Sequence, residues 1–287
     1  MELGPVGAIF RAAAIGRPHR RIRIPSTLQT LIRDLQRRKA RGRRGLALVE
    51  GVRLVEEVLL AKLPLKGAVV SADFERTARG RELVAELEKA SSPVEEVSMK
   101  MLATLADTDT PQGIIAIVEP RKWKLDDLPV NSGSTLLVVD GVQDPGNVGT
   151  LLRTAHALGA AGTLVLRGTA DVLSPKALRS AMGATFRHPF VTLEDGAFIQ
   201  WARTKDVTLW ATAADGVPLA KATAARNDKG KARGPVAVIV GNEGAGIRPQ
   251  LNAIAAQRVA VPLAPGAESL NVAVAAGILL YEVLRGK

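Results

Sequence analysis

Hydrophobic positions between residues 26 and 118 alternate between short continuous runs and helical spacing. Segment 26–45 carries Leu28, Leu31, Ile32 and Leu35 at helical intervals, which predicts one helix with Ser26 as its N-cap. Farther along, "LALVE", "LKGAVVSA" and "GIIAIV" predict strands, whereas "GVRLVEEVLLAK" and "GRELVAELEKA" predict amphipathic helices. Strands that alternate with helices over about a hundred residues indicate a small α/β domain.

A second unit begins after a polar segment. Residues 121–133, "RKWKLDDLPVNSG", carry one proline and end in turn formers, so we interpret them as a linker. Beyond it, "TLLVV" and "VAVIV" are near-continuous apolar runs, typical of a parallel sheet that is buried on both faces. "VTLWATAA" and "RVAVPLA" predict further strands, "SPKALRSAMGATF" and "SLNVAVAAGILLYEVLRG" predict helices, and residues 221–234 predict a charged loop. We therefore divide the chain into an extension (1–23), a small α/β domain (24–120), the linker, and a parallel-sheet α/β domain (134–287).

Composition excludes several classes of site. The chain contains no cysteine, so disulfides, thiolate metal sites and cysteine nucleophiles are ruled out. Its three histidines are far apart and predict no metal site, and neither GK[ST] nor G-x-S-x-G occurs. The longest apolar run, 270–284, is interrupted by Asn271 and Glu282 and is too short for a membrane span. We expect no membrane and no metal partner.

Positive charge is concentrated at the amino-terminal end. Of the net charge of +11, residues 1–50 carry twelve Arg or Lys against three acids, and thus +9. Such a basic region joined to a nearly neutral body indicates a polyanion such as RNA as partner. Residues 1–23 resemble an organelle transit peptide in charge only, and we interpret them as a disordered extension. The RNA-binding candidates are Arg37, Arg38, Lys39, Arg41, Arg43, Arg44 and Arg53.

Three unusual loops follow strands of the second unit, where open parallel sheets bind ligands. They are "DGVQDPGNVG" (140–149), "GNEGAGI" (241–247) and "PLAPGAESLN" (262–271). The glycine spacing in the second loop is not that of a dinucleotide fingerprint. The loops therefore predict a ligand that is bound largely through backbone groups.

"DGVQDPGNVGTLLRTAHALGA", "IVGNEGAGI" and "VPLAPGAESLNVAVAAGILLYE" together resemble the three motifs of the SpoU-type (TrmH-like) RNA 2′-O-ribose methyltransferases, in the family's order. The resemblance implies a catalytic domain with a C-terminal trefoil knot, S-adenosylmethionine (AdoMet) as cofactor, and a homodimer whose site is assembled from both protomers. It also implies methyl transfer to a ribose 2′-hydroxyl of structured RNA, ribosomal rather than transfer RNA, in the cytoplasm. A transfer RNA ribose methyltransferase, a non-catalytic RNA-binding or ribosome-assembly protein of the same fold, and a nucleotide-binding enzyme are the alternatives.

The resemblance also assigns site residues. Cofactor contacts would fall on Thr212, Ala213, Gly241, Asn242, Gly244, Val261, Leu263 and Leu270. The catalytic positions would be Arg153, Asn147, Glu243, Ser269 and Asn271.

The roles of these polar residues stay open at this point. Arg153 is the proton acceptor in descriptions of the family, but an arginine stays protonated, so an electrostatic role or a surface salt bridge is also possible. Asn147 and Ser269 could cap helices, and Glu243 could contact Asn147 or Arg153 or only hold the glycine loop. Arg179 could face solvent or an RNA phosphate.

Overall fold

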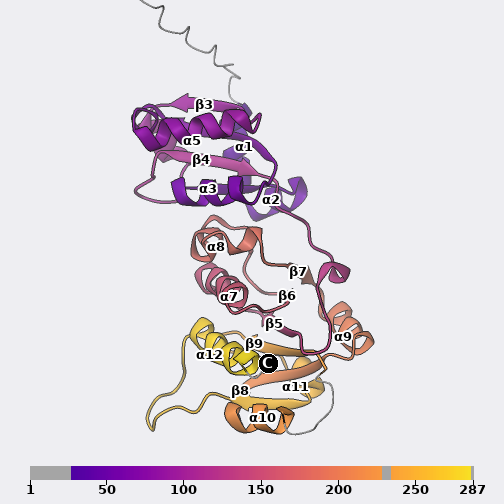
Figure 1. Ribbon diagram of the computed structural model, residues 1–287. Coiled ribbons are helices and arrows are strands. Elements are labelled where there is room, and N and C mark those ends of the chain that lie inside the picture. The colour runs from indigo at the N-terminus through magenta and orange to yellow at the C-terminus, as the bar shows by residue number, and fades with distance from the viewer. Residues whose placement is uncertain (1–26, 228–233, 286–287) are drawn as a thin grey trace, which may run out of the picture.

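The molecule consists of two units, each built around its own β-sheet, and Figure 1 shows one unit above the other. The structure is a computed structural model that describes residues 27–227 and 234–285. The extension 1–23 and the expected cap Ser26 lie outside the described residues.

The first sheet has four strands in the order β1-β4-β2-β3. Strand β4 runs antiparallel to both of its neighbours, and β2 and β3 are parallel. Helices α1 and α6 pack on one face of the sheet, and α3 and α5 pack on the other. The elements are β1 (Ala47–Glu50), β2 (Leu65–Ser71), β3 (Val94–Val97), β4 (Ile114–Val118), α1 (Thr27–Leu35), α2 (Arg38–Arg44), α3 (Val52–Leu60), α4 (Ala72–Glu75), α5 (Ala78–Lys89) and α6 (Met99–Leu105).

The single helix expected over 26–45 is in fact two, and the break has a physical cause. Arg37 has an extended backbone (φ −88°, ψ 131°) between α1 and α2. The Arg41 guanidinium donates to the carbonyl oxygens of Leu35 and Gln36 at 2.8 and 2.7 Å, satisfying acceptors at the end of α1. The assignment of Arg41 to RNA binding is therefore wrong: the residue is 4% exposed, and its guanidinium is occupied within the protein.

The second sheet has six parallel strands in the order β10-β8-β9-β5-β6-β7. Strands β5, β6 and most of β9 are buried throughout, as their apolar runs predict. The strands are β5 (Thr135–Asp140), β6 (Gly162–Leu166), β7 (Phe190–Leu193), β8 (Thr208–Pro218), β9 (Val236–Gly241) and β10 (Gln257–Ala260).

Helices cover both faces of this sheet. Helices α7 and α12 pack on one face, where Leu137, Val139 and Val238 point, and α9 and α11 pack on the other. The helices are α7 (Pro145–Ala157), α8 (Pro175–Ala181), α9 (Asp195–Thr204), α10 (Leu219–Asn227), α11 (Pro249–Ile254) and α12 (Val272–Arg285). The expected loop over 221–234 is wrong in its first half, because α10 continues to Asn227 and buries Ala222 and Thr223.

Apolar contacts and ion pairs join the two units. Leu178 of α8 is fully buried within the first unit's core cluster, beside α3. Arg41 contacts Asp171 at 2.6 Å, and Arg179 contacts Asp107 at 2.6 Å. Arg179 therefore makes an ion pair between the two units rather than facing solvent without a partner, and its contact with an RNA phosphate stays a prediction.

Candidate active site

A cavity of about 480 Å³ lies where the glycine-rich loop, the ends of β8 and β10 and the start of α12 meet. Its walls contain all eight residues that the sequence assigned to the cofactor, together with Glu243, Ser269 and Asn271 of the catalytic set. Residues as far apart in the chain as Thr212 and Leu270 therefore come together at one edge of the sheet, as expected for a parallel α/β fold. The assigned lining residues are Thr212, Ala213, Gly241, Asn242, Gly244, Val261, Leu263 and Leu270.

The glycine-rich loop is closed by its own hydrogen bonds. The Asn242 side-chain oxygen accepts from the backbone N–H groups of Gly244 and Ala245 at 3.0 and 2.8 Å, and its amide donates to the Gly141 carbonyl at 3.0 Å. A Cβ at Gly241 would lie 2.4 Å from the Gly246 carbonyl carbon. Only glycine fits there, because the loop's backbone doubles back against that position.

Three side chains form an amide relay at the mouth of the cavity. The Asn147 amide donates to Glu243 Oε1 at 2.8 Å, and Asn271 donates to Asn147 Oδ1 at 3.0 Å. Asn271 Oδ1 accepts in turn from the backbone N–H groups of Ala273 and Val274 at 2.9 and 3.4 Å. Both amide orientations are fixed by this sequence of partners. Glu243 thus pairs with Asn147, as one of the sequence hypotheses held.

The relay corrects two expected caps. Asp144, and not Asn147, caps α7, because its carboxylate accepts from the Asn147 backbone N–H at 2.9 Å. Asn271, and not Ser269, occupies the capping position of α12. Hydrogen bonding to Lys176 lowers the pKa of Asp144, so this cap stays ionised. Because Asp144 caps the helix, the Asn147 side chain is left available to the site.

Sequence reasoning missed the ionic anchor beneath the glycine loop. Asp140 ends β5 and is 1% exposed, and it accepts from Arg248 N and Nε at 2.8 and 2.5 Å. Arg248 Nη1 also donates to Asp195 at 2.5 Å. Burial alone would lower the pKa of Arg248, but the hydrogen bonds and charges of the two carboxylates outweigh it and raise that pKa. A lone Asp at the end of an apolar strand was the available signal, because a buried carboxylate requires a partner.

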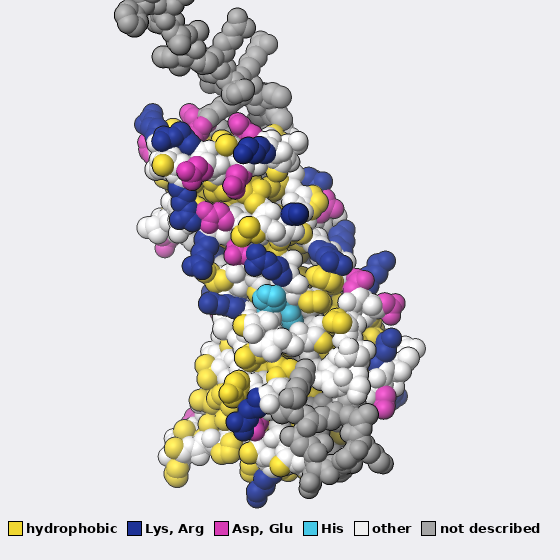
Figure 2. Space-filling view, in the orientation of Figure 1, with side chains coloured by type: hydrophobic (Ala, Val, Ile, Leu, Met, Phe, Trp, Pro, Cys, Tyr) yellow, Lys and Arg dark blue, Asp and Glu magenta, His cyan; other side chains and the backbone are white. Residues whose placement is uncertain are grey.

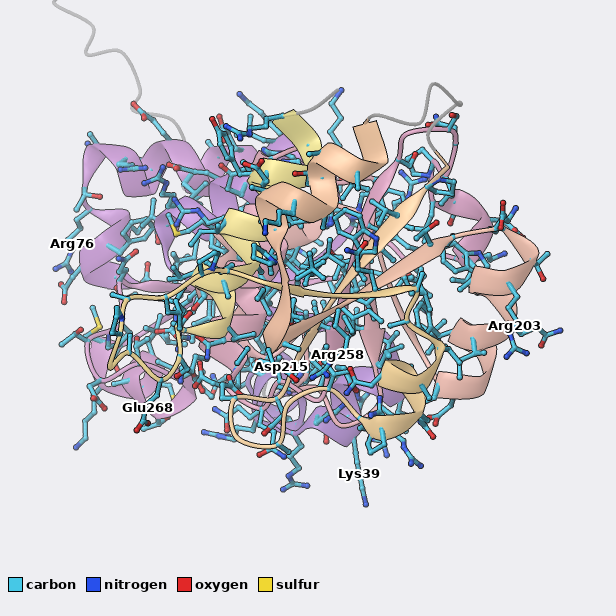
Figure 3. The ribbon with its side chains drawn as sticks, turned by 90° about the horizontal axis from the view of Figure 1, so that it is seen from below. Lys39, Arg76, Arg203, Asp215, Arg258 and Glu268 are labelled. Carbon is cyan, nitrogen blue, oxygen red and sulfur yellow. The ribbon has the colours of Figure 1, made fainter. Side chains whose placement is uncertain are left out.

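The cavity favours a cation. Glu243 and Glu268 line it, and none of the described residues that line it is Lys or Arg. Glu268 lies on the long segment between β10 and α12, and Asp215 and Arg258, paired at 2.5 Å, join β8 to β10 (Figure 3). Besides polar residues such as Asn242 and Ser269, the walls contain the aliphatic side chains of Val261, Leu263 and Leu270, which suit a flat aromatic ring.

Arg153 does not reach this cavity within its own chain. It lies exposed on α7, and its guanidinium forms no hydrogen bond or ion pair with any group in residues 27–227 and 234–285. The surface salt bridge considered from the sequence is thus not formed.

The other basic candidates divide by their contacts. Arg43 and Arg44 are exposed and contact Asp34 at 3.3 and 2.8 Å. Six of the seven RNA-binding candidates are exposed, namely Arg37, Arg38, Lys39, Arg43, Arg44 and Arg53. Lys and Arg side chains gather around the junction of the two units (Figure 2).

The described part of the chain contains neither a helix that could span a membrane nor a cluster of candidate metal ligands. No helix in 27–227 or 234–285 is long and apolar enough to cross a membrane. The same residues contain no group of three or more His, Asp or Glu side chains arranged to hold a metal ion.

Comparison with known proteins bears on the same regions. The model of the SpoU rRNA Methylase family matches residues 134–281, and that of the MRM3-like substrate binding domain matches residues 30–116. The 23S rRNA (guanosine(2553)-2′-O)-methyltransferase RlmP of Bacillus subtilis is 34% identical over 255 residues, covering 88% of this chain and 94% of that protein.

Solved structures agree with these matches. An AdoMet-bound rRNA methyltransferase from Sinorhizobium meliloti superposes with a TM-score of 0.78 and 31% identity, covering 91% of this chain and 95% of that one. The SpoU methyltransferase AviRb from Streptomyces viridochromogenes, in complex with AdoMet, gives a TM-score of 0.77 and 28% identity over 91% of this chain and 98% of that one.

Proposed function

The chain belongs to the SpoU rRNA methylase family, and from this premise we propose that it methylates one ribose 2′-hydroxyl of 23S rRNA in a site built from two protomers. It is an AdoMet-dependent RNA 2′-O-methyltransferase with an α/β fold. The observation that carries the proposal is the amide relay of Asn147, Glu243 and Asn271 at the mouth of a cavity that suits AdoMet.

The residues present fit the cofactor. AdoMet supplies an electrophilic methyl group on a sulfonium ion. The carboxylates of Glu243 and Glu268 favour its positive charge, and Gly241 leaves no room for a side chain where the loop closes. We assign adenine binding to the aliphatic side chains Val261, Leu263 and Leu270, and polar contacts to the backbone of Thr212, Ala213, Asn242 and Gly244.

Orientation of the ribose is the role we assign to the relay. The 2′-oxygen must meet the methyl group in line while its proton is lost or strongly polarised. Asn147 and Asn271 are fixed by their partners, so their remaining hydrogen-bonding capacity has a defined direction. Ser269 lines the same cavity and is assigned to substrate contact.

Arg153 is assigned to activation of the hydroxyl from a second copy of the chain. It lies outside the cavity of its own chain, while α12 beside it exposes Val274, Ile278 and Tyr281 by 52%, 41% and 57%. A homodimer that covers this stripe would bring Arg153 toward the other protomer's site. There its guanidinium would hold the adjacent phosphate and lower the pKa of the 2′-hydroxyl, acting as a fixed positive charge.

Substrate binding, chain path and location complete the proposal. Exposed Arg37, Arg38, Lys39 and Arg43 would contact RNA phosphates. The trefoil knot would lie where the chain leaves β10 at the sheet edge and returns through 261–271 to α12, which packs against β9 and α7. Cytoplasmic location is proposed from the bacterial rRNA methyltransferases among the relatives.

Transfer of labelled methyl from AdoMet to an unmodified 23S rRNA transcript tests the proposal. After alkaline hydrolysis of the wild-type product, we expect the label in one dinucleotide that stays intact. A 2′-O-methyl group prevents cleavage of the neighbouring phosphodiester bond. Arg153→Ala should lose most of the label while AdoMet binding is retained. Label in a transfer RNA transcript instead would redirect the substrate, and RNA binding without any label would support a non-catalytic protein.

A further inference from the structure

Two adjoining cavities form a recess over the amino-terminal end of α3. The inner cavity, of about 350 Å³, lies between the two units and is lined by Leu54 of α3 and by Met182, which follows α8. The outer cavity, of about 590 Å³, is lined by Phe74. Arg53 and Gln112 line both, so the recess is continuous. It is separate from the cofactor cavity, with which it shares no lining residue.

The hydrogen-bonding groups left available in the recess are mainly donors. Gln112 Oε1 accepts from the Val52 backbone N–H at 3.1 Å, which leaves the Gln112 NH₂ group facing outward as a donor. The Arg53 guanidinium is exposed, and it has no hydrogen-bond or ion-pair partner in the described part of the chain.

The carboxylates of the inner cavity are already engaged. Glu50 accepts from the Asp107 backbone N–H at 2.8 Å and from the Thr108 hydroxyl. Glu57 pairs with Arg187 at 2.6 Å. A ligand therefore meets donors that lack partners and acceptors that have them, which favours a ligand rich in carbonyl or phosphate oxygens.

Apolar surfaces provide faces for flat rings. Met182 is 38% exposed and has a left-handed backbone (φ 49°). The next residue, Gly183, packs against Glu57, so that a Cβ there would lie 2.7 Å from a Glu57 carboxylate oxygen. Phe74 is half-buried at the outer cavity. Thioether and aromatic groups both stack on nucleobases, and stacking tolerates any base.

Helix α8 links the recess to the reacting site. At its start, Lys176 contacts Asp144 at 2.6 Å, and Asp144 caps the helix that carries Asn147. At its end lies Met182 in the recess. These two ends are separated by about 9 Å along the helix axis, at about 1.5 Å per residue. The recess therefore borders α8, which packs directly against α7, the helix that carries Asn147.

We propose that this recess binds two consecutive unstacked nucleotides of the RNA substrate. One base enters the inner cavity, where the donors of Gln112 and Arg53 select the exocyclic acceptor O6 of guanine or O4 of uracil over the amino group that adenine and cytosine carry at the equivalent position. The next base stacks on Phe74. The inference rests on the proposed function, because it assigns to the same RNA a second contact outside the cofactor cavity.

Steady-state kinetics with an unmodified 23S rRNA transcript test the assignment. Phe74→Leu and Gln112→Glu should each raise the KM for RNA on the order of ten-fold, by loss of stacking or of a donor. The KM for AdoMet should stay unchanged. Phe74→Tyr should retain the wild-type value, and Gln200→Glu, on exposed α9, is the matched control for added charge. Melting temperatures and AdoMet affinity of each variant report on folding.

Photocrosslinking and competition provide independent readouts. A transcript that contains 4-thiouridine should crosslink to segments 50–57, 72–79 or 107–113, and poly(U) should compete with the transcript better than poly(C). An unchanged KM in both variants, or crosslinks confined to other segments, would refute RNA binding in the recess. If the wild type still methylates the transcript, the proposed function stands in that case. Absence of methylation by the wild type would refute the proposed function, and crosslinking would then still decide whether RNA occupies the recess.

Discussion

Lowering the pH from about 7.5 to about 5 should destabilise the fold through one buried histidine. His188 is 1% exposed, and its Nε2 shares a hydrogen bond of 2.8 Å with the Thr163 hydroxyl. Burial lowers the pKa of His188 from 6.5 to about 4, and the nearby His156, with ring centroids 5.9 Å apart, adds to this effect. The folded protein therefore holds the neutral imidazole where the unfolded chain takes up a proton.

The sign follows from these two pKa values. Above pH 6.5 neither state binds the proton, and the full stability is present. As the pH falls toward 4, the unfolded state gains protons and the folded state does not, so the free energy of unfolding decreases. Between about pH 7.5 and about pH 5 the loss is about 2 kcal/mol from the logarithmic ratio of the two titrations. Hydrogen bonds to basic partners lower the pKa values of Asp34, Glu119 and Asp144, so these carboxyls lose their contributions only at lower pH.

Urea unfolding followed by tryptophan fluorescence measures this loss, because Trp201 and Trp210 are buried in the core of the second unit. His188→Gln cannot take up the proton, so its free energy of unfolding should fall by about 2 kcal/mol less over the same pH interval. His156→Gln removes only the smaller cause of the lowered pKa of His188, so it should keep most of the wild-type pH dependence. An identical pH dependence in wild type and His188→Gln would refute the argument.

Three further outcomes are expected. Gly241→Ala should abolish AdoMet binding in calorimetry, because its Cβ would lie 2.4 Å from backbone. Glu243→Gln should weaken AdoMet binding through loss of negative charge while retaining the acceptor for Asn147 and hence the melting temperature. Arg41→Met should lower the free energy of unfolding by about 3 to 5 kcal/mol, because it leaves Asp171 and two carbonyl groups without their partner.

Controls separate these effects from general damage. Arg43→Met, on exposed surface, should change the unfolding free energy by less than about 0.5 kcal/mol. Retained AdoMet affinity in Gly241→Ala would mean that the loop can open to admit a methyl group. A drop in melting temperature in Glu243→Gln would mean that this carboxylate acts mainly in holding the loop.

Local patterns predicted most elements because their cause is local. Apolar runs such as 135–139 and 236–240 are buried on both faces of the second sheet, and the helical spacing of 272–285 became α12. The cofactor set was predicted as a group, because strand ends of a parallel sheet meet at one edge and the motif resemblance marked three of them. All eight residues line one cavity.

The errors lie where a distant partner decides. The break between α1 and α2 depends on Arg41, whose place is fixed by Asp171, 130 residues away. A cation in a basic cluster resembles every other cation in the sequence, and only the tertiary contact separates the buried one from the exposed ones. The cap of α7 was misassigned for a related reason. Asp144 and Asn147 both lie at the start of α7, and only the tertiary structure shows that Asp144 accepts from the helix backbone while Asn147 donates to Glu243.

The sequence by itself determined most of the strands and helices, which loops carry glycine, and which family the motifs resemble, because spacing and residue type act over a few positions. Only the tertiary structure decided which polar groups share a partner. The relay joins residues 147, 243 and 271, and Arg248, beyond the loop after the neighbouring strand β9, holds Asp140 at the end of β5. Such pairs form because burying a charge or an amide without a hydrogen-bond partner costs free energy. Only the fold determines which groups lie close enough to be that partner.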